Sequence, residues 1–137
     1  MSEIHPAMEA ARNSWRCVQA KDKEGWLALM ADDICLEDPI GVAITNPTGQ
    51  GVRGKSELSD FYDQNMATSD ISVEVHESHV AGDTSAHVLT LTTTLPGGVK
   101  STVRGIFTYY VNEAGQITNL RGYWQMSDMT FEQPDSV

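Results

Sequence analysis

The chain has 137 residues, the usual size of one domain, so we expect a single domain over residues 1–137 with one hydrophobic core. Nineteen acidic residues against nine basic ones give a formal net charge of −10, which repels phosphate backbones and anionic headgroups and excludes nucleic acid and membranes as partners. No leader-like segment opens the chain and no apolar run could span a bilayer, so we expect a cytoplasmic protein.

The first thirty residues predict a pair of helices. Pro6 suits a first helical turn, and apolar residues recur at helical spacing until residues 21–23 interrupt them. Asp22 suits the N-cap of a second helix, which ends before Ala31. The two buried stripes consist of Ala7, Ala11, Trp15 and Val18, and of Trp26, Leu29 and Met30.

Residues 34–54 predict a strand followed by a loop. Ile34, Leu36 and Asp38 alternate onto one face, and Pro39 keeps its predecessor extended, so an acid ends an apolar strand face. Residues 41–54 contain one proline and four glycines, which indicates a long loop of the kind that often covers a pocket.

The remaining sequence predicts a third helix and then strands. Helical spacing returns over residues 55–66, and turn signals at residues 96–98 and 112–115 separate extended runs. These runs are residues 71–75, 85–95, 99–111 and 116–126. Helices followed by an antiparallel meander favour an α+β fold in which a curved sheet wraps around the helices.

Asp38 carries the sharpest chemical signal. A carboxylate at the end of an apolar face is partly desolvated, which favours its neutral form and makes the anion a stronger base. Such a group can move a proton at carbon. The position also suits an aspartate that caps a turn with Pro39 and Gly41, so both roles are open.

Large aromatic residues could form the walls of a pocket. Period two over residues 99–111 places Phe107 and Tyr109 on one face, with Val103, Gly105 and Val111. Aromatic side chains with polar tips suit a flat hydrophobic ligand, although each one also fits an ordinary core. They are Trp15, Trp26, Tyr62, Tyr109, Tyr123 and Trp124.

Histidine and cysteine spacing predicts no metal site. Alternation groups His87 with apolar neighbours, and Cys17 and Cys35 form no CxxC or zinc pattern, so both thiols are expected to be reduced packing residues. Surface positions are expected for the other histidines, His5, His76 and His79. No phosphate loop or dinucleotide motif appears, so no cofactor is expected.

The outward face of the predicted sheet favours pairing with a second copy. Ile106, Tyr110 and Ile117 are expected there and are too apolar to remain in water. We therefore expect a homodimer, with a small hydrophobic molecule as the other partner.

Two stretches, residues 25–33 and Leu36-Glu37-Asp38-Pro39-Ile40-Gly41, carry a family resemblance that continues in Phe61-Tyr62 and Asn112-Glu113-Ala114-Gly115. They resemble the ketosteroid isomerases of the nuclear-transport-factor-2-like and SnoaL-like superfamily. The likeness covers nearly the whole chain and implies a cone-shaped sheet. Residues 14–19 and 121–124 look closer still to an actinobacterial branch.

The resemblance also implies a chemistry. The family's aspartate, which Asp38 matches, moves a proton between two carbons of a 3-oxo steroid. A tyrosine and a protonated aspartic acid donate hydrogen bonds to the dienolate oxygen in these enzymes. In this chain the two donor positions fall on Ser14 and Phe107, so neither of the family's donors is present, and Tyr62, Tyr109 and His87 are the candidates to replace them. Trp124 matches an aromatic residue that shields the catalytic acid.

Three functions are compatible with this sequence. The first is a steroid Δ-isomerase-like enzyme with Asp38 as base and Tyr62, Tyr109 or His87 polarising the substrate oxygen. The second is a ligand-binding module without efficient chemistry, and the third is a hydrolase or cyclase of the same superfamily. Ligand contacts are expected from Ser14, Trp15, His87, Phe107, Trp124 and Met126.

Overall fold

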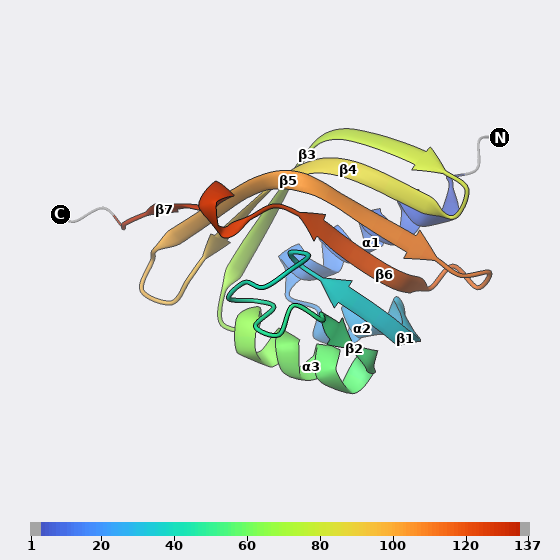
Figure 1. Cartoon of the computed structure of the whole chain (residues 1–137), viewed down its shortest axis with the longest axis horizontal. Coiled ribbons are helices and arrows are strands. Elements are labelled where there is room, and N and C mark those ends of the chain that lie inside the picture. The colour runs from blue at the N-terminus through green and yellow to red at the C-terminus, as the bar shows by residue number, and fades with distance from the viewer. Residues whose placement is uncertain (1–3, 135–137) are drawn as a thin grey trace.

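The computed structural model describes residues 4–134, which fold into helices and one curved sheet (Figure 1). In chain order the elements are α1 (Pro6–Ala20), α2 (Lys23–Ala28), β1 (Met30–Glu37), β2 (Val52–Arg53), α3 (Gly54–Asn65), β3 (Asp70–Ala81), β4 (Thr84–Thr94), β5 (Lys100–Val111), β6 (Ile117–Tyr123), a short 3-10 helix (Met126–Asp128) and β7 (Thr130–Glu132). The expected α+β architecture is confirmed.

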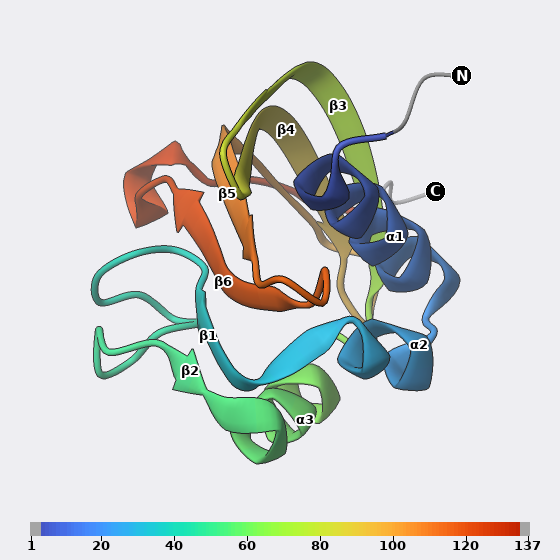
Figure 2. The same ribbon diagram turned by 90° about the vertical axis from the view of Figure 1, so that its right-hand side faces the viewer.

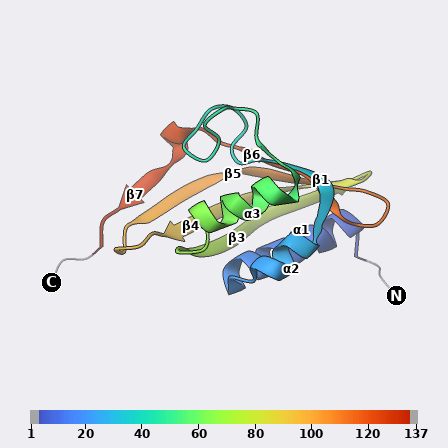
Figure 3. The same ribbon diagram turned by 90° about the horizontal axis from the view of Figure 1, so that it is seen from below.

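The strands form a sheet in the order β2-β1-β6-β5-β4-β3, and β7 pairs with the beginning of β5. The meander from β3 to β6 is antiparallel as predicted, whereas β1 runs parallel to β6. The sheet is therefore mixed. It is strongly curved, and α1, α2 and α3 pack along it (Figure 2). In the view from below, α3 is seen in front of the strands, and α1 and α2 lie next to each other (Figure 3).

Helix α1 packs closely on the sheet because its inward face is made of small residues. Pro6 occupies its first turn, and the backbone N–H of Ala7 donates to the His5 side chain, which caps the helix. The buried face consists of Ala7, Ala10, Ala11, Ser14 and Cys17. Side chains of this size let the helix backbone approach β3, β4 and β5.

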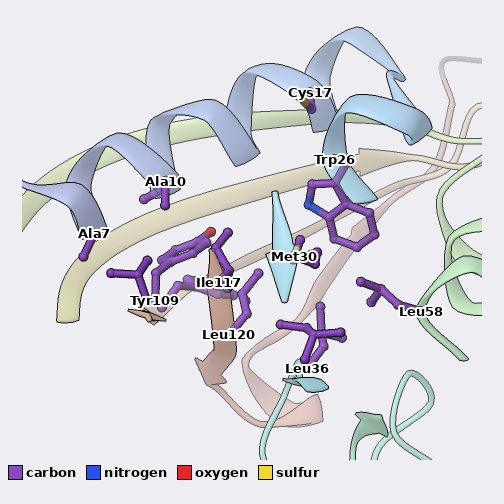
Figure 4. Close-up of a cluster of buried hydrophobic side chains, with 14 of the residues drawn as sticks. Ala7, Ala10, Cys17, Trp26, Met30, Leu36, Leu58, Tyr109, Ile117 and Leu120 are labelled. Atoms are coloured by element: carbon purple, nitrogen blue, oxygen red, sulfur yellow. The ribbon is translucent and has the colours of Figure 1, made fainter. Parts of the chain in front are cut away.

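One hydrophobic core joins the helices to the sheet (Figure 4). Trp26 of α2, Met30 of β1 and Leu58 of α3 are buried in it. The cluster continues through Ile117 and Leu120 of β6. Burying side chains of this size stabilises the fold by about 1.5–3 kcal/mol each. This core lies where the helices meet the sheet. It does not fill the whole concave face of the sheet, and part of β3, β4 and β5 lines a cavity instead.

Several predicted boundaries differ from the structure. Strand β1 begins at Met30, which the helical stripe had included, because α2 ends at Ala28 and the chain extends immediately afterwards. The predicted loop 41–54 includes β2, and β7 was not predicted. Ile117, expected on the outer face, is fully buried because its backbone N–H donates to the Leu29 carbonyl at 2.9 Å and holds it beneath that turn.

The two cysteines are structural in character. Cys17 and Cys35 are both buried and free. Burial raises the pKa of each thiol, which keeps it protonated and unreactive at neutral pH. Their predicted role as reduced packing residues agrees with this placement.

Candidate active site

The concave face of the sheet encloses an apolar cavity of about 290 Å³. Strands β3, β4 and β5 form its floor, and α1, α3 and the segment that follows β1 form its walls. Seven of the nine side chains that the sequence singled out line it: Ser14, Trp15, Asp38, Phe107, Tyr109, Trp124 and Met126. Tyr62 and His87 do not.

Asp38 lies directly after β1, where its half-buried carboxylate reaches the cavity. Its Oδ1 accepts a hydrogen bond from Nε1 of Trp124 at 2.7 Å. Gly122 on β6 makes room for this pair, because a Cβ there would lie 2.7 Å from Oδ1 of Asp38 and 2.9 Å from Nε1 of Trp124. The hydrogen bond from Trp124 thus holds the carboxylate close to β6, and the missing side chain of Gly122 leaves room for it there.

The environment makes Asp38 a stronger base than an ordinary aspartate. Desolvation raises its pKa to about 6, and the Trp124 hydrogen bond opposes part of that rise. At neutral pH most of the carboxylate is still ionised, so the group can accept a proton and then return it. A pKa close to the working pH is what a general base requires.

Tyr109 supplies a hydroxyl donor at the deep end of the same cavity. Its Oη accepts a hydrogen bond from Nε1 of Trp15 at 2.9 Å. Ser14, which also lines the cavity, accepts from Nε1 of Trp26 at 3.1 Å. Since the Tyr109 hydroxyl accepts from Trp15 and makes no other side-chain hydrogen bond within residues 4–134, its own O–H can donate to a ligand. Burial raises the pKa of Tyr109, which keeps that proton in place.

His87, a candidate for polarising a ligand oxygen, does not line the cavity and has its ring engaged by two serine side chains. The Ser85 hydroxyl donates to the Ala7 carbonyl at 3.0 Å, so it must accept from Nε2–H of His87, 2.8 Å away. Nδ1 then accepts from the Ser78 hydroxyl at 2.7 Å. Both ring nitrogens are occupied, and burial lowers the pKa of His87 to about 4, so the ring is neutral. Trp15, edge-on at 4.8 Å, packs over it.

Tyr62, another candidate for that role, lies behind the cavity lining. It is buried, and its ring packs against Trp26 with centroids 5.8 Å apart, while Lys23 Nζ lies 5.9 Å above it. Trp26 lines the cavity and Tyr62 does not. Tyr62 therefore supports a wall of the cavity from behind.

The sequence reasoning missed several polar residues of the cavity lining. Thr93 of β4 and Ser101 of β5 both line it, as do Thr45 and Asn65. Extending the alternation of β5 two residues back from Val103 would have placed Ser101 on the cavity face. No group of three or more histidine, cysteine, aspartate or glutamate side chains within residues 4–134 could hold a metal ion.

Comparison with known proteins assigns the family. The SnoaL-like domain matches residues 11–120. The chain belongs to the SnoaL-like family. A steroid Delta-isomerase from Nocardioides simplex is 30% identical over 102 residues, which cover 74% of this chain and 76% of that enzyme. Within residues 4–134, no helix has the length and apolar character needed to cross a membrane.

Solved structures place this SnoaL-like chain among ketosteroid isomerase-like proteins. The Δ5-3-ketosteroid isomerase from Mycobacterium sp. is 54% identical with a TM-score of 0.92, over 94% of this chain and all of that one. RV0760c from Mycobacterium tuberculosis, in complex with estradiol-17beta-hemisuccinate, is 51% identical with a TM-score of 0.89, over 93% and 100%. The epoxide hydrolase/cyclase-like enzyme SalBIII, at 17% identity, 88% and 92% coverage and a TM-score of 0.76, shares the fold alone.

Proposed function

We propose that this protein is a cofactor-independent isomerase that moves a proton between two carbons of a 3-oxo steroid or a similar flat ketone. The observation that carries the proposal is the Asp38 carboxylate, which opens into an apolar cavity with its pKa raised to about 6. A base of this strength, half-buried at the wall of an apolar cavity, suits abstraction of a proton next to a ketone.

In the proposed reaction, Asp38 removes a proton from the carbon adjacent to the carbonyl and the electrons move to the ketone oxygen, forming a dienolate. The free O–H of Tyr109 donates a hydrogen bond to that oxygen as its charge develops. The protonated Asp38 then returns the proton to a carbon further along the conjugated system. The double bond moves, and enzyme and substrate together neither gain nor lose an atom.

The relatives support a steroid as the substrate class. Two of them are named as steroid or ketosteroid isomerases, and RV0760c binds an estradiol derivative. A lining built mainly from apolar and aromatic side chains is compatible with the same kind of ligand.

A second candidate function is a steroid-binding module with little chemistry. It is favoured by Phe107, a buried residue at the position where the family resemblance expects an acidic donor. Phe107 carries no donor, so the substrate oxygen would depend on the Tyr109 hydroxyl in place of an acidic group. A hydrolase or cyclase gains no support, because its structural likeness rests on the fold alone.

The deciding experiment compares wild type with Asp38→Asn on a 3-oxo-Δ5 steroid, followed by the absorbance of the conjugated product. We expect turnover by wild type and a loss of at least about 1000-fold in the variant, while both still bind the product. Asp33→Asn, an exposed change in the same strand, is the matched control. Equal turnover by wild type and Asp38→Asn contradicts the proposal, and binding without turnover by wild type favours the module.

A further inference from the structure

The sheet register arranges the cavity floor in rows. Residues paired across neighbouring strands share a face, so each row crosses the floor at one level. At the deep end, Tyr109 of β5 pairs with Leu120 of β6, and Phe107 follows one row outward. Phe107 pairs with Gly122 of β6. A Cβ at Gly122 would meet both the Phe107 ring and Oδ1 of Asp38, so Asp38 lies at this second level.

The outermost row of the floor crosses four strands. Ile71 of β3 pairs with Thr93 of β4, Thr93 pairs with Ser101 of β5, and Ser101 pairs with Phe131 of β7. All four side chains line the cavity. Ser101 lies six residues before Phe107, which corresponds to roughly 20 Å along an extended strand and less across a concave face. This row therefore lies at the end of the cavity remote from Asp38.

Two hydroxyl groups of this row, those of Thr93 and Ser101, face each other across β4 and β5. Within residues 4–134, neither hydroxyl makes a side-chain hydrogen bond. Ser101 is only 8% exposed, whereas Phe131 beside it is 57% exposed, so the row marks the boundary between the cavity and its mouth. Two rows lie between it and the level of Asp38, and both are apolar: Val73, Leu91 and Val103 form one, and Leu89 with Gly105 forms the next.

The cavity is thus apolar in the middle and polar at both ends. We propose that Thr93 and Ser101 form a second polar subsite, which binds a hydroxyl or keto oxygen at the end of the ligand remote from Asp38. The inference rests on the proposed function, because a ketone held at Tyr109 directs the far end of a flat ligand toward this row. Each hydroxyl can donate or accept, so both kinds of oxygen are recognised.

Binding of two conjugated 3-oxo-4-ene steroids tests the subsite, one with a keto group at carbon 17 and one with no oxygen there. Tryptophan fluorescence reports affinity without turnover. We expect Ser101→Ala and Thr93→Val each to weaken binding of the 17-keto steroid about three- to tenfold and to leave the 17-deoxy steroid within about twofold. Thr92→Val, whose residue lies outside the cavity lining and pairs with Thr102, should change neither affinity.

Two outcomes overturn the inference while leaving the proposed function intact. One is equal weakening of both steroids in the variants, which would mean that packing and not hydrogen bonding was lost. The other is no weakening of either. Unchanged binding of the 17-deoxy steroid shows in the same titration that each variant is folded. If neither steroid binds wild type, the proposed function fails together with the subsite.

Discussion

Trp124 donates the one side-chain hydrogen bond that the Asp38 carboxylate accepts from the described part of the chain, over 2.7 Å to Oδ1. Oδ2 receives no side-chain hydrogen bond from residues 4–134. A carboxylate held at one oxygen and free at the other has a fixed orientation and still has a lone pair for a substrate proton. Trp124 therefore both positions the base and restrains its pKa.

We predict that activity depends on the ionisation of Asp38. Because its pKa is raised to about 6 and the anion is the base, kcat/KM should rise with pH through about 6 and level off above it. Trp124→Phe removes a hydrogen bond that lowers this pKa, so the midpoint should move to higher pH. Steady-state rates between pH 4.5 and 8.5 check both statements. An unshifted midpoint in Trp124→Phe contradicts the assigned hydrogen bond.

The same base should lower the stability of the fold. Between about pH 4, where the unfolded aspartate titrates, and about pH 6, the native state holds a proton that the unfolded state releases, so stability falls as pH rises. Asp38→Asn mimics the neutral acid and should raise the free energy of unfolding at pH 8 by about 1–3 kcal/mol. Urea titrations at pH 8 and pH 4 measure this, and the gain should disappear at pH 4.

Tyr109→Phe should remove the donor to the substrate oxygen. Because an oxyanion donor acts mainly in the transition state, we expect kcat to fall about 100-fold with little change in KM. Tyr110→Phe deletes the same atom from the next residue, which does not line the cavity, and serves as the control. Full activity of Tyr109→Phe would show that another group polarises the ketone.

The outer face of the sheet supports our proposal of a homodimer. Ile106 and Tyr123 pair across β5 and β6 and are 47% and 46% exposed, so they place adjacent apolar surface in water. We expect light scattering at micromolar concentration to report a dimer, and Ile106→Asp to shift it toward monomer. A wild-type monomer would contradict the proposal, and Val42→Asp, on an exposed loop, should have no effect.

The sequence located the site residues through the alternation of side chains along a strand. Alternation indicates which face of the sheet a side chain lies on, but not whether other side chains cover it. It placed Phe107 and Tyr109 correctly on the cavity side of β5, and it grouped His87 with apolar neighbours. It could not show that the Trp15 ring covers His87. Nor could it show that Trp15 donates to Tyr109, because a contact between residues 94 apart depends on how the helix docks on the sheet.

Pairings between distant segments were predictable only in part. Turn signals identified the meander, since neighbouring strands joined by short turns pair with each other. The parallel pairing of β1 with β6 has no local signal, because a long stretch of chain separates the two strands. That pairing carries Asp38 alongside Gly122 and Trp124, so the position of the base was decided by topology.

The outermost row of the cavity floor and the Asp38 level belong to different parts of the sheet. The position of Ser101 is set by the pairing of β5 with β7, whereas the position of Asp38 is set by the pairing of β1 with β6. A substitution in the outermost row can therefore change the contacts at the mouth without moving the segment that carries Asp38. Under the proposed function, the preference for a ligand could then evolve separately from the proton transfer.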